Sequence, residues 1–408
     1  MVNKSDKQHN QSISCYSNEQ KLVLYCSRTT INRQLEEKIL LLIERDINWQ
    51  YFLEISYFHK VIPLIYNCLK QLKTNNIPWE IINKLGSYYR ENAFISLAYA
   101  ERLEEIIKAL QHNDINVMSF KGPVLAASAY GNLALRDFGD IDLLIREDNL
   151  SDALSILADL GYPLPIQIAK MEGRPYLEFP IFHESGKYQK SFDIFDDRAN
   201  IVVEIHWSLF NKSFSFPVEF EDLWQHKNTV YIDEKTEIPT FCVEDLLVYL
   251  CAHASKHSWT TFQWLCDVNE LICVNPKLDW QKALDRAEQW GCFRMLCLGL
   301  ILAKNLLDTP LPENIIQLLE RERMAQLLAD RVSNRLFSKS LLSKLNSYIF
   351  LLKCREKNRD KLIYLFSIIF TPNKKDWYYI QLPKGFFSFY YFIRPYRLLK
   401  NFLFSSKN

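Results

Sequence analysis

The hydrophobic periodicity changes twice along the 408 residues, and these changes constrain the fold more than any other feature. From 31 to 112 the apolar residues recur every three or four positions, which is the period of a helix. From 113 to 240 the chain instead shows short β-like runs, such as INVMSF, DIDLLI, YLEFPIFHE at 176–184 and NIVVEIHW. The helical period returns from 241 to 370. The sequence therefore predicts an α+β fold, in which a small mixed-sheet domain lies between N- and C-terminal helical bundles.

The two ends of the chain differ from these three regions. Residues 1–30 are polar, and we expect a disordered N-terminus. Residues 371–408 form a basic and aromatic tail with seven Lys or Arg against a single acid, Asp376. Three interpretations of this tail stay open: a final helix that packs its aromatic rings on the bundle, a contact with a membrane surface, or a contact with nucleic acid.

Composition excludes several classes of protein. The formal net charge is +1, so the whole molecule does not bind polyanions by charge alone. The ten cysteines are scattered without a CxxC pair, which is typical of reduced thiols in a cytosolic protein. No apolar stretch reaches the roughly 18 residues of a membrane-spanning helix, and the first residues lack the apolar core of a signal peptide. We therefore expect a cytoplasmic protein, with surface association to a membrane as the alternative.

Two acidic residues at the start of an apolar strand carry the chemistry. Asp140 and Asp142 are two positions apart, so in a strand both carboxylates face the same side while Ile141 and Leu143 face the core. Two carboxylates this close repel each other unless a cation lies between them. Mg²⁺, or Mn²⁺ in its place, takes such oxygen ligands and keeps positions open for phosphate. The pair therefore predicts a site for two-metal phosphoryl or nucleotidyl transfer.

A third carboxylate normally completes such a site, and Glu204 is the best candidate. Glu204 and His206 share one face of the strand Ile-Val-Val-Glu-Ile-His-Trp, whose other face is apolar. Since unpaired buried carboxylates are costly, that face is expected to line a polar cleft. Asp193, on the preceding β-like run, is the reserve candidate. His206 would either contact substrate as a base or orient Glu204 through a hydrogen bond.

The spacing of these motifs resembles a known family. Lys121-Gly122 precedes a helix that ends near Gly131, and Arg136 stands just before Asp-Ile-Asp-Leu-Leu. With Glu-Ile-His-Trp at 204–207, this arrangement resembles the uncharacterised bacterial nucleotidyltransferase family within the polymerase-β-like superfamily. A later helical segment is similar too, and comprises His253, Lys256-His257 and Trp264-Leu265-Cys266-Asp267. The resemblance covers roughly residues 35 to 400.

The resemblance implies transfer of a nucleoside monophosphate from a nucleoside triphosphate to an acceptor, with release of pyrophosphate. Asp140 and Asp142 would hold both metals, and Glu204 would complete the metal that activates the acceptor hydroxyl. The superfamily usually opens this motif with Gly-Ser or Gly-Gly, whereas here the pair is Lys121-Gly122. The Lys121 ammonium would bind a triphosphate oxygen in place of the missing Ser hydroxyl, and Gly122 beside it would contact the nucleotide. The helix that begins at Pro123 would add its N-terminal dipole.

Other charged residues are candidates for nucleotide binding. Arg136 would contact a phosphate through its planar fork, or form a structural ion pair with Asp137 or Asp148. Lys256 or His257 would reach the triphosphate from the C-terminal helical region. A zinc site at His253 and His257 is disfavoured, because no second cluster of ligands accompanies them.

Two rival functions stay open beside nucleotidyl transfer. A glycosyltransferase would use Asp-x-Asp to bind a nucleotide-sugar through a metal, but it would have a longer Rossmann-like region before the motif. A non-catalytic nucleotide-binding or interaction module would keep the fold. The Lys-Gly departure favours it, whereas the retained Asp140, Asp142 and Glu204 argue against it. If the chain transfers nucleotides, the acceptor is a small molecule, a sugar phosphate, an RNA end or a protein side chain. The absence of a strongly basic chain weighs against a long nucleic acid.

Overall fold

The computed structural model describes residues 13–162, 191–196, 201–210, 218–232, 236–338, 343–372, 374–383 and 386–405. Within these segments, no helix combines the length and the apolarity needed to cross a membrane. The β-like run predicted at 176–184 lies outside the described residues.

The described part of the N-terminal region forms the helices α2 (Asn18–Cys26), α3 (Arg33–Ile43), α4 (Trp49–Phe58), α5 (Ile62–Gln71) and α6 (Trp79–His112). The prediction that residues 1–30 are disordered was wrong for α2. Ser17 and Gln20 form a capping box at its N-terminus, and Leu22 and Val23 are completely buried. The apolar run of α2 is too short to show a helical period, and tertiary burial stabilises it.

A four-stranded mixed sheet follows, built from β1 (Val117–Ser119), β2 (Ile141–Ile145), β3 (Ser191–Asp196) and β4 (Ile201–His206). The order in space is β1-β2-β4-β3, with β2 and β4 parallel and the two outer pairs antiparallel. The connecting segments are α7 (Gly122–Tyr130), η1 (Leu133–Leu135), η2 (Glu147–Asn149), α8 (Leu150–Asp159) and α11 (Phe220–Gln225). A separate hairpin joins β5 (Asn228–Tyr231) to β6 (Glu237–Thr240).

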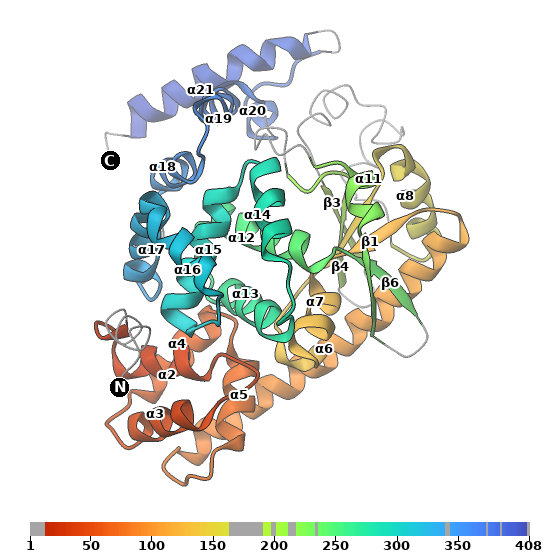
Figure 1. The fold of residues 1–408 in the computed structure, drawn as a ribbon. Coiled ribbons are helices and arrows are strands. Elements are labelled where there is room, and N and C mark those ends of the chain that lie inside the picture. The colour runs from red at the N-terminus through yellow and green to blue at the C-terminus, as the bar shows by residue number, and fades with distance from the viewer. Residues whose placement is uncertain are drawn as a thin grey trace.

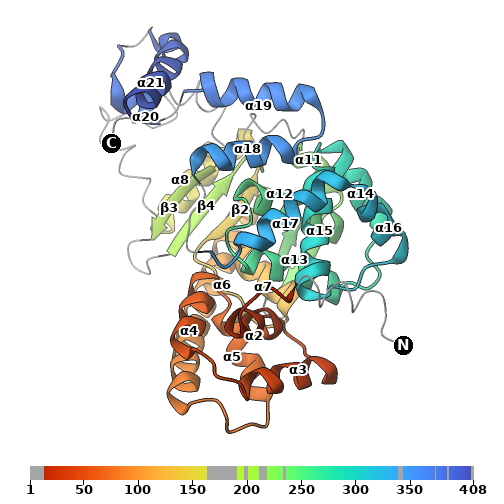
Figure 2. The ribbon, with the colours of Figure 1, turned by 90° about the vertical axis from the view of Figure 1, so that its left-hand side faces the viewer.

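Helices form the rest of the chain. Their bounds are α12 (Val243–Lys256), α13 (Gln263–Val274), α14 (Trp280–Gln289), α15 (Phe293–Leu307), α16 (Glu313–Arg321), α17 (Arg323–Arg335), α18 (Lys344–Cys354), α19 (Asn358–Phe370), α20 (Lys374–Tyr379), η5 (Phe387–Phe389) and α21 (Tyr390–Ser405). Helices α2–α5 lie at one end of the molecule and α19–α21 at the opposite end, with the sheet between them (Figures 1 and 2). The predicted α+β class is confirmed.

The two faces of the sheet pack against different helices. Ile141, Leu143, Val203 and Ile205 belong to a core cluster with residues of α6 and α8. Leu144 instead belongs to a second cluster with residues of α12. Because side chains alternate along a strand, Asp142, Glu204 and His206 lie on the α12 side of the sheet. The strand pattern thus delivers three polar side chains to one face.

The second core cluster joins the two helical regions that the sequence separates. It includes buried residues of α2–α5 together with those of α12–α17. One contact across it is the His59 imidazole, whose Nδ1 accepts a hydrogen bond from the Phe262 backbone N–H over 3.2 Å. The N-terminal helices therefore brace the C-terminal helices that cover the polar face of the sheet.

Candidate active site

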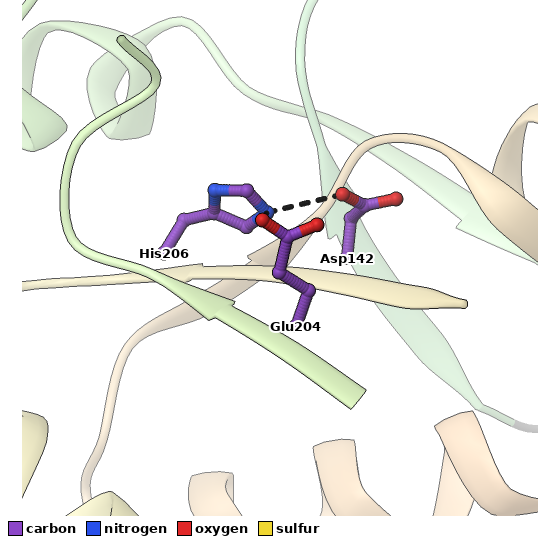
Figure 3. A group of neighbouring side chains, drawn as sticks. All are labelled: Asp142, Glu204 and His206. Carbon is purple, nitrogen blue, oxygen red and sulfur yellow. Dashed lines mark hydrogen bonds and ion pairs between the residues drawn. The ribbon is translucent and has the colours of Figure 1, made fainter. Parts of the chain in front are cut away.

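The polar face of the sheet gathers an aspartate, a glutamate and a histidine. Asp142 on β2 is in register with Glu204 on the parallel strand β4, and His206 follows two residues later (Figure 3). His206 Nε2 lies 3.0 Å from Asp142 Oδ1 and 3.5 Å from Glu204 Oε1. One ligand atom from each of the three lies within 4.8 Å of the others, a grouping able to hold a metal ion. Asp142 and His206 are buried, whereas the Glu204 side chain is 23% exposed.

Lys121 contributes a positive charge to this cluster. It is the N-cap residue of α7, and its Nζ lies 2.9 Å from Asp142 Oδ1. Burial by itself raises the pKa of Asp142, but the Lys121 ammonium and His206 outweigh it, so that pKa is lowered. Burial acts on the Lys121 ammonium in the opposite sense, and the Asp142 carboxylate overcomes it and raises the pKa of Lys121. Asp142 and Lys121 therefore form a buried ion pair.

The second carboxylate oxygen of Asp142 has no partner. Asp142 Oδ1 accepts from both Lys121 and His206, while Oδ2 is buried and makes no hydrogen bond. A buried oxygen that lacks a hydrogen bond costs about 1–3 kcal/mol. Such a cost is removed when a cation or another ligand binds there, and a hard divalent ion suits a carboxylate oxygen.

Asp140 lies beside this group but not on the strand. It immediately precedes β2, is partly buried, and is not among the three residues grouped above. The Asp142 carboxylate, followed by burial, raises the pKa of Asp140, and Glu204 adds to the effect. Asp140 therefore shares the electrostatic field of the cluster, and its role as a metal ligand stays a prediction.

Gly122 packs directly against the backbone of Asp140. Its φ of +52° is one that residues with a side chain rarely adopt, and a Cβ there would lie 2.8 Å from the Asp140 carbonyl oxygen. The Lys-Gly and Asp-x-Asp motifs are thus fitted to each other through the backbone. This close approach explains why a glycine follows Lys121. The predicted contact of Gly122 with a nucleotide stays a prediction.

Arg136 forms its ion pair outside the Asp142–Glu204–His206 cluster. Its Nε and Nη2 lie 2.7 and 2.9 Å from the two carboxylate oxygens of Asp267 on α13, and Tyr130 also donates to Asp267 over 2.6 Å. The structural partner predicted for Arg136, Asp137 or Asp148, was wrong, because the fold brings a carboxylate from 131 residues further along the chain. Two of its three guanidinium nitrogens are committed to this pair, and a contact with phosphate stays a prediction.

Helix α12 covers the polar face and contributes Tyr249, which the sequence analysis missed. The Tyr249 ring is buried against Phe120, and burial raises its pKa, with Lys121 and Asp142 also acting on it. Its hydroxyl lies 3.4 Å from His253 Nδ1, and the ring of His253 contacts that of His257. The spacing of four residues between these aromatic side chains was the signal that could have found Tyr249.

The remaining predicted residues lie at the end of α12 and on β3. Lys256 is the last residue of α12 and His257 follows it, about two turns beyond Tyr249. Their roles in nucleotide binding stay predictions. Asp193 is in register with Glu204 through the antiparallel β3–β4 pair, and its side chain lies outside the described residues.

Comparison with known protein families gives a match over the central part of the chain. The family model described as an uncharacterised nucleotidyltransferase matches residues 45–308, from just before α4 to the end of α15. The matched segment contains every residue of the cluster and Lys121, and it confirms the family suspected from the sequence. Helices α16–α21 lie beyond it. No protein of curated function matches the chain.

Proposed function

The chain belongs to this nucleotidyltransferase family, and on that premise we propose that it transfers a nucleoside monophosphate from a nucleoside triphosphate to an acceptor hydroxyl or other nucleophile at the Asp142–Glu204–His206 cluster. Nucleotidyl transfer, and an NTP as donor, follow from the family. The placement of the reaction at these residues is our inference.

The observation that carries the proposal is the unpartnered Oδ2 of Asp142. It is buried on the face of the sheet that also presents Glu204, and a charged oxygen is held there at a cost in free energy. By contrast, the buried carboxylate of Asp267 has both oxygens bonded to Arg136. Asp142 therefore fits a ligand better than it fits a purely structural role.

The donor set fits a divalent cation held by Asp142 and Glu204, with Asp140 as a further candidate. Two carboxylates suit Mg²⁺ or Mn²⁺, and an imidazole donor from His206 would favour Mn²⁺ over Mg²⁺. A bound cation would neutralise charge on the triphosphate and favour deprotonation of the acceptor.

Lys121 and His206 would orient the Asp142 carboxylate, and Lys121 would also bind the nucleotide. Both contact Asp142 Oδ1, so both hold the carboxylate in one orientation on the shared face. The Lys121 ammonium is also a positive charge at the start of α7, whose N-terminal dipole has the same sign. We propose that Lys121 binds a triphosphate oxygen there and substitutes for the missing Ser hydroxyl.

Calorimetric titration with ATP, CTP, GTP and UTP, each with and without Mg²⁺ or Mn²⁺, tests the proposal. We expect metal-dependent binding of at least one NTP, lost in Glu204→Gln and kept in the control Asp152→Asn, which changes an exposed acid on α8. Binding of a UDP-sugar without any NTP would favour the glycosyltransferase. No metal-dependent binding of either would favour the non-catalytic module.

Transfer itself is tested with NTPs labelled in the α-phosphate. Incubation with a cell lysate should place label on an acceptor in a metal-dependent manner, and the labelled fraction identifies that acceptor as a small molecule, sugar phosphate, RNA or protein. Retained labelling in Asp142→Asn would place the reaction elsewhere.

A further inference from the structure

Helix α21 is amphipathic with its faces reversed. Phe392, Tyr396 and Leu399 lie on one side of the helix and are 72, 60 and 61% exposed. Arg394 and Arg397 point the other way and are buried. A helix on the surface of a protein in water normally buries its apolar stripe and exposes its charges. The arrangement therefore indicates that the outer face of α21 meets something other than water.

The buried arginines are held in place by a single carboxylate. Asp376 of α20 is fully buried, and its two oxygens lie 2.6 Å from Arg397 Nε and 3.3 Å from Arg394 Nη1. Arg394 Nε also donates to the Ile368 carbonyl of α19 over 2.9 Å. These bonds fix the rotation of α21, because turning the apolar stripe inward would move both arginines outward and leave the buried Asp376 carboxylate without a counter-charge.

The exposed apolar surface extends beyond α21. An apolar hollow of about 420 Å³ is lined by Ile380, Leu382, Phe386, Phe389, Phe392, Ile393 and Tyr396. On α19, Leu362 and Phe366 are also more than half exposed. Helices α19–α21 stand at the edge of the molecule in both views (Figures 1 and 2). Of the three interpretations of the tail, packing of its aromatic rings on the bundle does not describe these exposed side chains.

Charge distinguishes among the surfaces that could cover this face. The segment from 371 to 408 has five lysines, at 374, 375, 384, 400 and 407, and its only acid is the Asp376 already bound to both arginines. Lys375 and Lys400 are exposed. Exposed tyrosines, with an apolar ring and a polar tip, accompany them at Tyr378 and Tyr396. The exposed Lys375 and Lys400, together with an apolar, tyrosine-containing face, match an anionic bilayer surface, whereas a second copy of this segment would bring like charges together.

We propose that the α20–α21 arm, residues 374–383 and 386–405, lies flat on an anionic lipid surface, with Phe389, Phe392, Tyr396 and Leu399 among the acyl chains and the exposed Lys375 and Lys400 at the headgroups. No described helix is able to span the bilayer, so the contact is peripheral. The inference is independent of the chemistry at Asp142, and either can fail without the other.

Flotation of the full chain with vesicles tests the proposal. One set contains phosphatidylglycerol and phosphatidylcholine in equal parts, and the other contains phosphatidylcholine alone. We expect the chain to float with the anionic set, and the variant Phe392→Glu with Leu399→Glu to bind at least about tenfold more weakly. The matched control is Phe94→Glu with Leu97→Glu, because these residues are also exposed on a helix, α6.

Three outcomes would overturn the proposal. The first is a wild-type chain that stays in solution with both sets of vesicles. The second is equal flotation of the arm variant and the control. The third is a dimer, measured by light scattering during gel filtration, that the arm variant disperses, since the face would then cover a second copy. Both variants change exposed positions, and circular dichroism checks that each is folded.

Discussion

The substitution Asp142→Asn separates the structural and the functional parts of the site. If Asp140 and Asp142 only repelled each other, this change would remove the repulsion, and the folding stability would stay unchanged or rise. The structure predicts the opposite, because Asp142 is the buried partner of the Lys121 ammonium and of His206. Removing the negative charge leaves Lys121 with only 11% exposure and no counter-charge at 2.9 Å.

The expected loss follows from that geometry. Removing one partner of a buried ion pair costs about 3–5 kcal/mol. The Asn carbonyl oxygen still accepts from Lys121, and the unsatisfied Oδ2 is relieved of its charge, so we expect a smaller loss, at or below the lower end of that range, of about 2–3 kcal/mol. By contrast Glu204→Gln, whose side chain is 23% exposed, should cost under about 1 kcal/mol. Both substitutions should abolish metal-dependent NTP binding.

Urea unfolding followed by circular dichroism, without added metal, measures the two losses, with Asp152→Asn as the control for removal of an exposed acid. The double variant Lys121→Met with Asp142→Asn should recover part of the loss, since it removes both charges of the pair. An Asp142→Asn protein as stable as the wild type would refute the buried ion pair.

Three further predictions concern the surroundings of the site. Gly122→Ala should lower the free energy of unfolding in urea by about 1–3 kcal/mol, because φ at this position is positive and the new Cβ would meet the Asp140 carbonyl. The control Gly139→Ala, whose Cβ would meet nothing within 4 Å, should cause no such loss, and equal losses would contradict the prediction. Asp267→Ala should cost about 3–5 kcal/mol by stranding the buried Arg136, and a loss under about 1 kcal/mol would exclude a buried pair. Burial lowers the pKa of His59 to about 4 from 6.5, so only the unfolded chain binds this proton between those values. The free energy of unfolding of the wild-type chain should therefore fall by about 3 kcal/mol more than that of His59→Gln as the pH drops from 6.5 to 4. Identical pH profiles of the two proteins would refute this prediction.

The local sequence determined which side chains share a face. The period of two in a strand is a property of the backbone, so Asp142 and Leu144 oppose Leu143, and Glu204 and His206 oppose Ile205, wherever the strands lie. The sequence also predicted the helix after Lys-Gly, which the structure places at Gly122–Tyr130. The α+β class followed from the same short-range patterns.

Only the tertiary structure decided which of these faces meet. The parallel pairing that sets Asp142 beside Glu204, and the salt bridge between Arg136 and Asp267, join residues far apart in the chain, and no local period encodes such a pairing. The reversed faces of α21 also depend on tertiary contacts, because Asp376 on α20 pairs with both arginines and holds them inward. The amphipathic pattern of α21 alone would predict that its apolar side is buried and its arginines are exposed.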